Sequence, residues 1–338
     1  MKKAVLVGIS YATNENLRQN GFVEQPGAHR DVARLRKLLT AQYGYKNENI
    51  TVLVDDDARP RDKWPTYENI IRAMEDLVAG SKPGDHIFFS FSGHGGQVVA
   101  REDEDEDDGQ DEILLPIDCT YDPSTPDNFS SFIRDDLSSL ISFVKEIRRI
   151  LVKKLPEGVR CVMIFDCCHS GTASDLPSVQ ECLSPTTPTS PLISPGPQSG
   201  AFAQMQTVTL NDATAPPPYL WPSTRATNVY PPSRRTSVLV EKERNVTSWS
   251  ACLDDQVTFG QTSGGIFIKA FTKALEANPN PTHRQLLQAL RKELDAVTKK
   301  QNAKMQTRSQ EGHPPYVAPR PQLGSLSPHL ILHDQFTL

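Results

Sequence analysis

Apolar segments alternate with amphipathic segments along the chain. Four segments are apolar on both faces of an extended strand: 3–10, 49–56, 85–92 and 159–168. Three others repeat apolar side chains at helical spacing: 27–44, 66–80 and 134–155. Thr66 is a suitable N-cap for the second of these helices. Buried strands separated by helices are typical of a parallel sheet covered on both sides, so the pattern predicts an α/β fold.

A segment rich in Pro, Ser and Thr interrupts this alternation. Residues 177–244 cannot bury enough apolar surface to offset the entropy of ordering them, so we expect a disordered insert. The strand pattern returns at 245–252 and 321–326, and the helix pattern returns at 264–277 and 282–300. These additions predict a six-stranded sheet in one domain, with a large part (1–176) and a small part (245–338) on either side of the insert (177–244).

Composition and charge narrow the class of protein. The 338 residues carry a net charge of −5 and are 37% hydrophobic, which is typical of a globular chain and offers no basic surface for nucleic acid. Six cysteines without a CxxC pair do not indicate a disulfide framework. The apolar start ends at Ile9, too early for a secretory signal, and no segment is long enough to span a bilayer. We expect a cytoplasmic or nuclear protein without a membrane partner.

Two of the predicted strands end in residues that can do chemistry. Side chains two apart in a strand point the same way, so Asp166 and Cys168 are expected on one face and Cys167 on the other. The same period places Ser92 and His94 together. Reactive groups of open α/β sheets gather beyond the carboxyl ends of strands. If these two strands are neighbours, about 4.8 Å apart, the imidazole and the thiol of Cys168 form a dyad.

A Cys-His dyad has a clear chemical use. A thiol with an ordinary pKa near 8.5 needs a neighbouring base to become a nucleophile at neutral pH, and His94 can supply it. Gly93 and Gly95 leave room for a substrate backbone, and the N–H groups of Gly95 and Cys168 are candidates for an oxyanion hole. His169 is assigned a structural role. Either dyad residue alone would more often be a packed or turn residue, but their pairing at strand ends favours catalysis.

These segments resemble a known family. FSGHGGQ and DCCHSG are similar to the histidine and cysteine boxes of the metacaspases, and PGAHRDVARL, DGQDEILLPID, IRDDL, SACLDDQ and PQLGS follow the family's order. The resemblance covers nearly the whole chain except the insert. It implies a caspase-like fold, cleavage of proteins or peptides after Arg or Lys, a frequent need for calcium, and a monomer. Because the first strand starts at once, we expect no N-terminal prodomain.

The resemblance also assigns residues by position. His94 would be the general base and Cys168 the nucleophile. Asp31, Ser92 and Asp166 would line the S1 pocket, which receives the residue before the cut; two carboxylates there attract a cation. Ala28 stands where family members often have cysteine. Without the resemblance, Asp31 would be interpreted as a surface carboxylate on a helix.

An acidic segment raises the question of metal binding. Residues 101–118 do not form an EF-hand, because with Gly109 sixth the twelfth position is Leu115 instead of glutamate. Most of this segment is expected to be a solvated loop. The resemblance instead implies calcium ligands at four positions: Asp111, Asp135, Asp136 and Asp175. Calcium would act as an activator by ordering the loop behind Cys168; neither zinc nor an organic cofactor is expected.

The insert carries basic residues that such a protease can cut in itself. The candidate self-cleavage sites are Arg225, Arg234, Arg235, Lys242 and Arg244. The chain would then be a zymogen activated by its own cleavage.

Other functions remain open at this point. A catalytically silent, calcium-responsive scaffold shares the fold, although both dyad positions are intact. Another Cys-His reaction, such as acyl transfer, is disfavoured only by the acidic pocket. A nucleotide hydrolase is disfavoured because no GK[ST] follows the glycines after His94.

Overall fold

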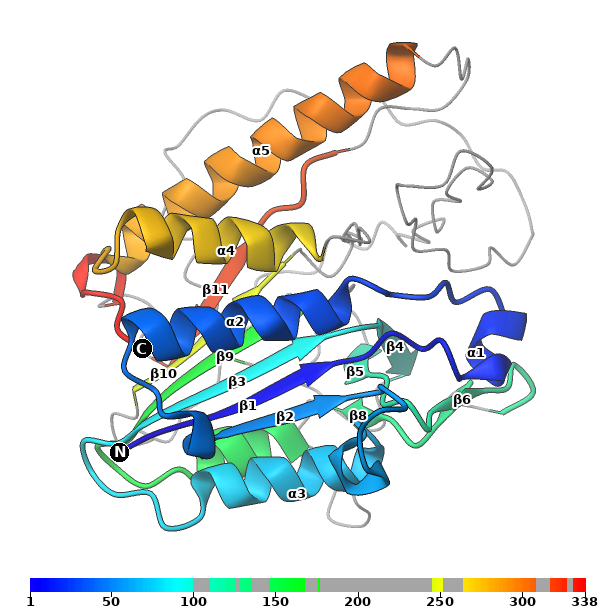
Figure 1. Ribbon diagram of the computed structural model, residues 1–338, viewed down its shortest axis with the longest axis horizontal. Coiled ribbons are helices and arrows are strands. Elements are labelled where there is room, and N and C mark those ends of the chain that lie inside the picture. Colours follow the sequence, from blue (N-terminus) through cyan, green and yellow to red (C-terminus); the bar gives the residue numbers. More distant parts are fainter. Residues whose placement is uncertain are drawn as a thin grey trace, which may run out of the picture.

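A six-stranded sheet forms the centre of the computed structural model (Figure 1). The structure describes residues 1–99, 110–125, 128–134, 146–167, 176, 245–251, 264–307, 317–326 and 331–338. The strands are β1 (Lys2–Gly8), β2 (Ile50–Val54), β3 (His86–Ser92), β9 (Arg160–Asp166), β10 (Asn245–Ser250) and β11 (Gln322–Ser325), in the order β11-β10-β9-β3-β1-β2. Only β10 and β11 pair antiparallel. The predicted mostly parallel α/β sheet of six strands is confirmed.

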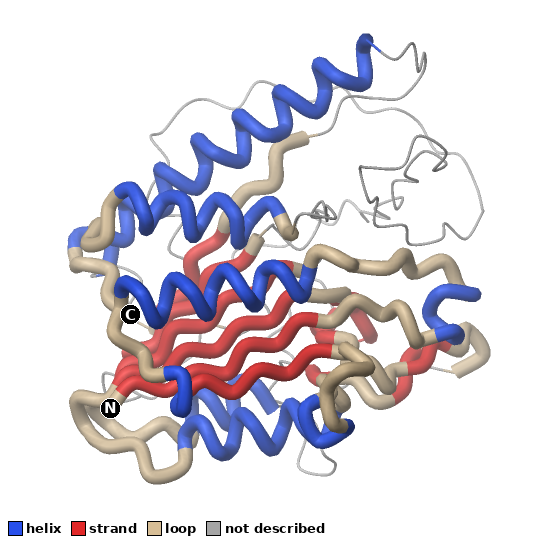
Figure 2. The backbone as a smooth tube through the Cα atoms, in the orientation of Figure 1, coloured by secondary structure: helices blue, strands red, loops and turns tan. Residues whose placement is uncertain are grey.

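Helices cover both faces of this sheet (Figures 1 and 2). On one face lie α2 (Ala28–Gln42) and α4 (Ile266–Ala277), and α5 (His283–Thr307) packs against α4. On the other face lie α3 (Tyr67–Val78) and a wide helical turn at Arg148–Lys153. Each face has its own apolar core. The expected Thr66 cap is present, because its side chain accepts a hydrogen bond from the Asn69 N–H.

Several short elements were not predicted. A three-stranded antiparallel sheet consists of β4 (Gly95–Val99), β5 (Gln110–Leu114) and β8 (Ile133–Arg134), and a second ladder pairs β6 (Thr120–Tyr121) with β7 (Phe129–Ser130). The helix α1 (Glu15–Gln19) and 3₁₀ turns at Asn47–Asn49, Arg61–Lys63 and Ile331–His333 complete the described elements. Glycines and charged residues in these segments hide the strand alternation. Of the helix expected at 134–155, Arg134 instead belongs to β8, residues 135–145 lie outside the described residues, and a helical turn is described from residue 146.

Close packing places α2 directly over the end of β1. A Cβ atom added to Gly8 would lie 2.7 Å from the carbonyl oxygen of Ala28 and 2.7 Å from a methyl of Val32. This glycine therefore brings the first turn of α2 next to the carboxyl end of the sheet. β10, which follows the 177–244 segment in the chain, pairs with β9 in the same sheet. Among the described residues, no helix has the length and apolar character needed to cross a membrane.

Candidate active site

The strands that carry the predicted dyad are neighbours. β3 and β9 pair in parallel, and the register places Ser92 directly opposite Asp166. His94 is two residues beyond Ser92, and Cys168 is two residues beyond Asp166 in the sequence but lies outside the described residues. Cys167 is described and is buried in the core cluster on the α3 side of the sheet. The alternation predicted this orientation for Cys167.

His94 is buried in an aromatic setting. Its side chain is 1% exposed, and its ring centroid lies 4.5 Å from that of Tyr11 and 5.5 Å from that of Phe22. Ser92, by contrast, hydrogen-bonds Asp31 of α2. The alternation of side chains along the strand therefore holds as far as Ser92, where β3 ends. The prediction that the His94 side chain lies on the same face as Ser92 is wrong. The backbone turns after Ser92 and directs the imidazole toward the core on the α3 side.

The contacts of His94 determine its protonation state. Nε2 lies 2.8 Å from the Val23 carbonyl oxygen, which can only accept, so Nε2 carries the hydrogen. Nδ1 is buried and has no hydrogen-bond partner among the described residues. Burial lowers the pKa of His94 to about 4, so the imidazole is neutral at neutral pH. The lone pair of Nδ1 is thus free to take a proton, as a general base requires.

Three elements bring Asp31, Ser92 and Asp166 together at the N-terminus of α4. Asp31 Oδ2 accepts from the Gly265 N–H at 2.7 Å and from the Ser92 hydroxyl at 3.1 Å. Asp166 Oδ2 accepts from the Ile268 N–H at 3.1 Å. Both carboxylates are almost fully buried. The positive end of the helix dipole therefore partly compensates two buried acids that would otherwise repel each other.

This compensation is incomplete. Burial raises the pKa of Asp31 and of Asp166 above the ordinary range, and the negative charge of Asp166 raises the pKa of Asp31 further. The Arg34 guanidinium, 3.2 Å from Asp31 Oδ1, acts in the opposite direction. The positive charge of Lys269 lowers the pKa of Asp166 in the same way. A further cation entering beside these groups would favour their charged forms. The pair is therefore suited to bind a guanidinium or an ammonium group.

Two adjacent glycines before α4, which the helix pattern marks only as the start of a helix, are part of this arrangement. A Cβ atom on Gly264, whose φ is +115°, would lie 2.3 Å from Asp31 Oδ1. A Cβ atom on Gly265 would lie 2.0 Å from Asp166 Oδ2. The backbone before α4 can approach both carboxylates this closely only because these two residues have no side chain. The adjacent glycines before an apolar helix were the available signal.

The two glycines beside His94, Gly93 and Gly95, occupy their positions for different structural reasons. A Cβ atom on Gly93 would lie 2.8 Å from the Tyr11 hydroxyl, so the glycine accommodates this internal contact. The expected room for a substrate backbone stays a prediction. Gly95 begins β4, opposite Leu114 of β5. The Leu115 N–H donates to the His94 carbonyl, and hydrogen-bonded pairs alternate in an antiparallel ladder, so the Gly95 N–H points away from β5. This direction is compatible with an oxyanion-hole donor.

Comparison with known proteins identifies the family. The model of the metacaspase peptidase C14 domain matches residues 2–177. The chain belongs to the metacaspase family. It is 34% identical to metacaspase-1A of Aspergillus oryzae over 87% of this chain and 64% of that protein, and 34% identical to metacaspase-1A of Aspergillus niger over 87% and 67%. It therefore spans about two thirds of the length of these relatives.

A solved structure supports the fold. A protein from Geobacter sulfurreducens superposes with a TM-score of 0.52 at 16% sequence identity, covering 100% of this chain and 98% of that one. Together with family membership, the sheet order and the covering helices confirm the predicted caspase-like α/β fold. The chain thus carries the peptidase domain of a family of cysteine-type peptidases.

Several residues expected to function in this metacaspase fall beyond the described part of the chain. Asp111 is described only as backbone, in β5 opposite Val98. Asp135, Asp136 and Asp175 lie outside the described residues, as do the candidate cleavage sites Arg225, Arg234, Arg235, Lys242 and Arg244. The described residues contain no group of three metal-ligating side chains. The calcium site and self-cleavage therefore stay predictions.

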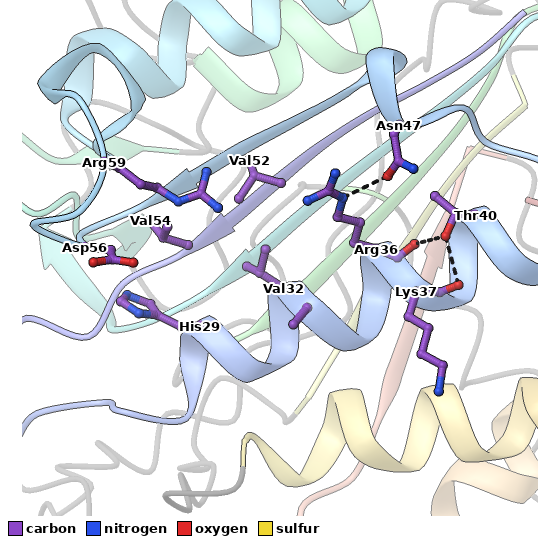
Figure 3. A pocket seen from close by; sticks show the side chains of 11 residues that line it. His29, Val32, Arg36, Lys37, Thr40, Asn47, Val52, Val54, Asp56 and Arg59 are labelled. Atoms are coloured by element: carbon purple, nitrogen blue, oxygen red, sulfur yellow. Dashed lines mark hydrogen bonds between the residues drawn. The ribbon is translucent and has the colours of Figure 1, made fainter.

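A cavity of about 570 Å³ lies away from these residues, between α2 and the edge strand β2 (Figure 3). None of the predicted site residues lines it. Its walls combine valines of both elements with polar and charged side chains, among them His29, Arg36 and Arg59. Figure 3 shows His29 near Asp56 at one end of the cavity. His29 also contacts Asp55, a buried residue considered further below.

Proposed function

We propose that this metacaspase is a calcium-dependent cysteine endopeptidase that cleaves after Arg or Lys through Cys168 and His94. The observation that carries the proposal is His94 itself. It is a buried, neutral imidazole with its hydrogen on Nε2, and its Nδ1 has no hydrogen-bond partner in the described part of the chain. It lies beyond the end of the strand next to the one that leads into Cys168.

Each proton transfer of the proposed reaction has a named group. His94 Nδ1 takes the proton of the Cys168 thiol, and the thiolate sulfur attacks the carbonyl carbon of the scissile bond. The N–H groups of Gly95 and Cys168 stabilise the oxyanion. The imidazolium gives the proton to the leaving amine as the C–N bond breaks, which yields a thioester. His94 Nδ1 then takes a proton from the water that attacks the thioester, and returns it to the Cys168 sulfur as the C–S bond breaks, which frees the acid product and the thiol. The Val23 carbonyl holds the Nε2 hydrogen throughout, since it accepts at 2.8 Å.

The buried acids support basic specificity. Asp31 and Asp166 are close enough for the charge of one to raise the pKa of the other, and the Ser92 hydroxyl joins the cluster. An Arg or Lys side chain would relieve this repulsion with charge-assisted hydrogen bonds. An acidic side chain would add a third negative charge and be rejected.

A positional-scanning peptide assay tests reaction and specificity together. Wild type should cleave libraries with Arg or Lys before the cut and no others, and Cys168→Ala should cleave none. Cleavage after acidic or apolar residues, or undiminished cleavage by Cys168→Ala, would contradict the proposal. Asp76→Asn, on the solvent side of α3, is a matched control that removes a carboxylate outside the cluster and should keep the specificity.

The calcium dependence has support from the backbone. Arg134, the residue before Asp135, pairs with Ile113, two residues from Asp111, so the ladder brings two of the candidate acidic segments side by side. Calcium binds well to several carboxylate oxygens at once. Its positive charge would offset the repulsion between these acidic segments and hold them in one arrangement. Calcium should raise the melting temperature of Cys168→Ala, and Asp111→Asn should reduce this shift. Equal activity of wild type in chelator and in excess calcium would contradict the dependence.

Self-processing is the remaining part of the proposal. The insert offers basic residues between the two parts of the domain, and intact mass after calcium addition should show wild type cut after one or more of them. Cys168→Ala is the control and should stay whole. An intact wild-type chain, under conditions in which it cleaves arginyl peptides, would reject self-processing while leaving the peptidase proposal in place.

A further inference from the structure

A buried tyrosine contacts both the backbone and the ring of His94. Tyr11 lies three residues beyond β1 and is fully buried. Its hydroxyl accepts from the His94 N–H at 2.8 Å and donates to the Leu115 carbonyl at 2.6 Å. Its ring lies 4.5 Å from the imidazole. Burial raises the pKa of Tyr11 well above its ordinary value, so the hydroxyl keeps the hydrogen that it donates.

This hydroxyl occupies a place in the β4–β5 ladder. The Leu115 N–H donates to the His94 carbonyl at 3.1 Å, and the return bond of such a pair would run from the His94 N–H to the Leu115 carbonyl. The phenol of Tyr11 is inserted between these two groups and bridges them. The absence of a side chain at Gly93 makes the room for this insertion. The side chain of Tyr11, which follows the end of β1, therefore sets the position of the His94 backbone.

Tyr11 is itself held in an unusual conformation. Its φ is +58°, in the left-handed region that non-glycine residues seldom adopt. The Asp55 carboxylate, which follows β2, accepts from the N–H groups of Ser10 and Tyr11 at 2.7 and 2.8 Å and from the Ser10 hydroxyl at 2.8 Å. His29 of α2 approaches the same carboxylate at 2.7 Å. Asp55 thus fixes the turn that presents Tyr11 to His94.

We propose that Tyr11, with Asp55 behind it, is a positioning residue that sets the backbone and ring of His94 so that Nδ1 stays available as the base for Cys168. The proposal rests on the proposed function in one respect, which is that His94 is the base. Without the phenol, the His94 N–H can pair directly with the Leu115 carbonyl. That closure draws His94 toward β5 and away from the arrangement that leaves Nδ1 available.

The test is the pH dependence of Cys168 alkylation by iodoacetamide, followed by peptide mass. Small and uncharged, this probe reports the thiolate independently of the S1 pocket. Wild type should react at neutral pH, whereas His94→Ala and Tyr11→Phe should react with an apparent pKa shifted toward that of an ordinary thiol, about 8.5. Peptide cleavage by Tyr11→Phe should lose roughly 10- to 100-fold in kcat with KM unchanged. Asp55→Asn should change both readouts in the same direction and by less.

Controls separate positioning from general destabilisation. Tyr45→Phe removes another buried hydroxyl, one without a partner among the described residues, and should leave the alkylation profile unchanged. In the His94→Ala background, Tyr11→Phe should have no further effect on alkylation, because the two residues act as one unit. A wild-type profile for folded Tyr11→Phe, or additive effects in the double variant, would overturn the positioning proposal. Alkylation of wild type that does not depend on His94 would instead overturn the proposed dyad.

Discussion

The Gly265→Ala substitution tests how α4 holds the two buried acids, Asp31 and Asp166. The backbone of Gly265 has φ −60° and ψ 146°, which alanine adopts without strain, so the substitution changes only the occupied space. The new methyl would lie 2.0 Å from Asp166 Oδ2 and 2.7 Å from its Cγ. No van der Waals contact is that short. Non-bonded contacts of carbon atoms are optimal at roughly 3.5–4.0 Å, so either the Asp166 carboxylate or the first turn of α4 must move by on the order of 1 Å or more.

The displacement should remove the bond from the Ile268 N–H to Asp166, now 3.1 Å long. A hydrogen bond to a charged group contributes about 1.5–3 kcal/mol, which corresponds to roughly 10- to 150-fold in kcat/KM. We expect this loss for arginyl peptides, since only a cationic side chain uses the full charge of the pocket. Overpacking should also lower the free energy of unfolding by about 1–3 kcal/mol.

The assay compares kcat/KM for arginyl peptides with the rate of Cys168 alkylation and with urea unfolding. Gly265→Ala should lose peptide turnover and keep alkylation, because Asp166 does not contact His94 among the described interactions. Gly44→Ala is the control: its φ is +70° and nothing lies within 4 Å of the added methyl, so it should lose stability without losing turnover. Full turnover of arginyl peptides by Gly265→Ala would refute the reasoning that α4 fixes the carboxylates of the proposed S1 pocket.

Three further predictions concern charge and burial. The pKa of Asp31 is raised on folding, so ionisation of Asp31 removes stability as the pH rises through that raised value. Asp31→Asn should therefore have a higher melting temperature at pH 7.5, by about 2–4 °C for each kcal/mol, and should lose turnover of arginyl peptides. A lower melting temperature would contradict this prediction. Burial lowers the pKa of His94 to about 4, so the stability that the neutral imidazole contributes is complete above the unfolded pKa near 6.5 and is lost as the pH falls toward 4. Urea unfolding should therefore show that His94→Gln loses less stability than wild type over this pH range. An equal loss in both proteins would count against the buried neutral imidazole. Cys167→Ser should keep turnover but lose about 1–3 kcal/mol of stability in urea, whereas an inactive, fully stable variant would implicate the wrong cysteine.

The sheet and its main helices were predictable because their apolar patterns are strong. Strands such as β3 and β9 are apolar on both faces, and helices such as α3 carry a clear cap at Thr66. The small sheet of β4, β5 and β8 was missed because two glycines begin β4 and acidic residues occupy β5. Strand pairing there depends on tertiary contacts, including the phenol of Tyr11, and local sequence does not encode them.

The site was predictable only in part. The strand period correctly separates Cys167 from Asp166. Applied beyond the strand end at Ser92, however, the same period misplaced the ring of His94. The roles of Gly264 and Gly265 depend on how α4 approaches two distant strands, which one sequence does not show. Likewise, the partner of the His94 Nε2 is a carbonyl, and backbone groups carry no residue-specific signal.

Covalent labelling with an arginyl chloromethylketone tests most directly whether Cys168 and His94 form a working dyad beside an acidic pocket. Intact mass and peptide mass should show a single adduct on Cys168 of wild type, strongly slowed in His94→Ala and in Asp31→Asn. A glutamyl analogue should label far more slowly. Labelling on another cysteine, or equal rates in wild type and His94→Ala, would contradict the proposed dyad.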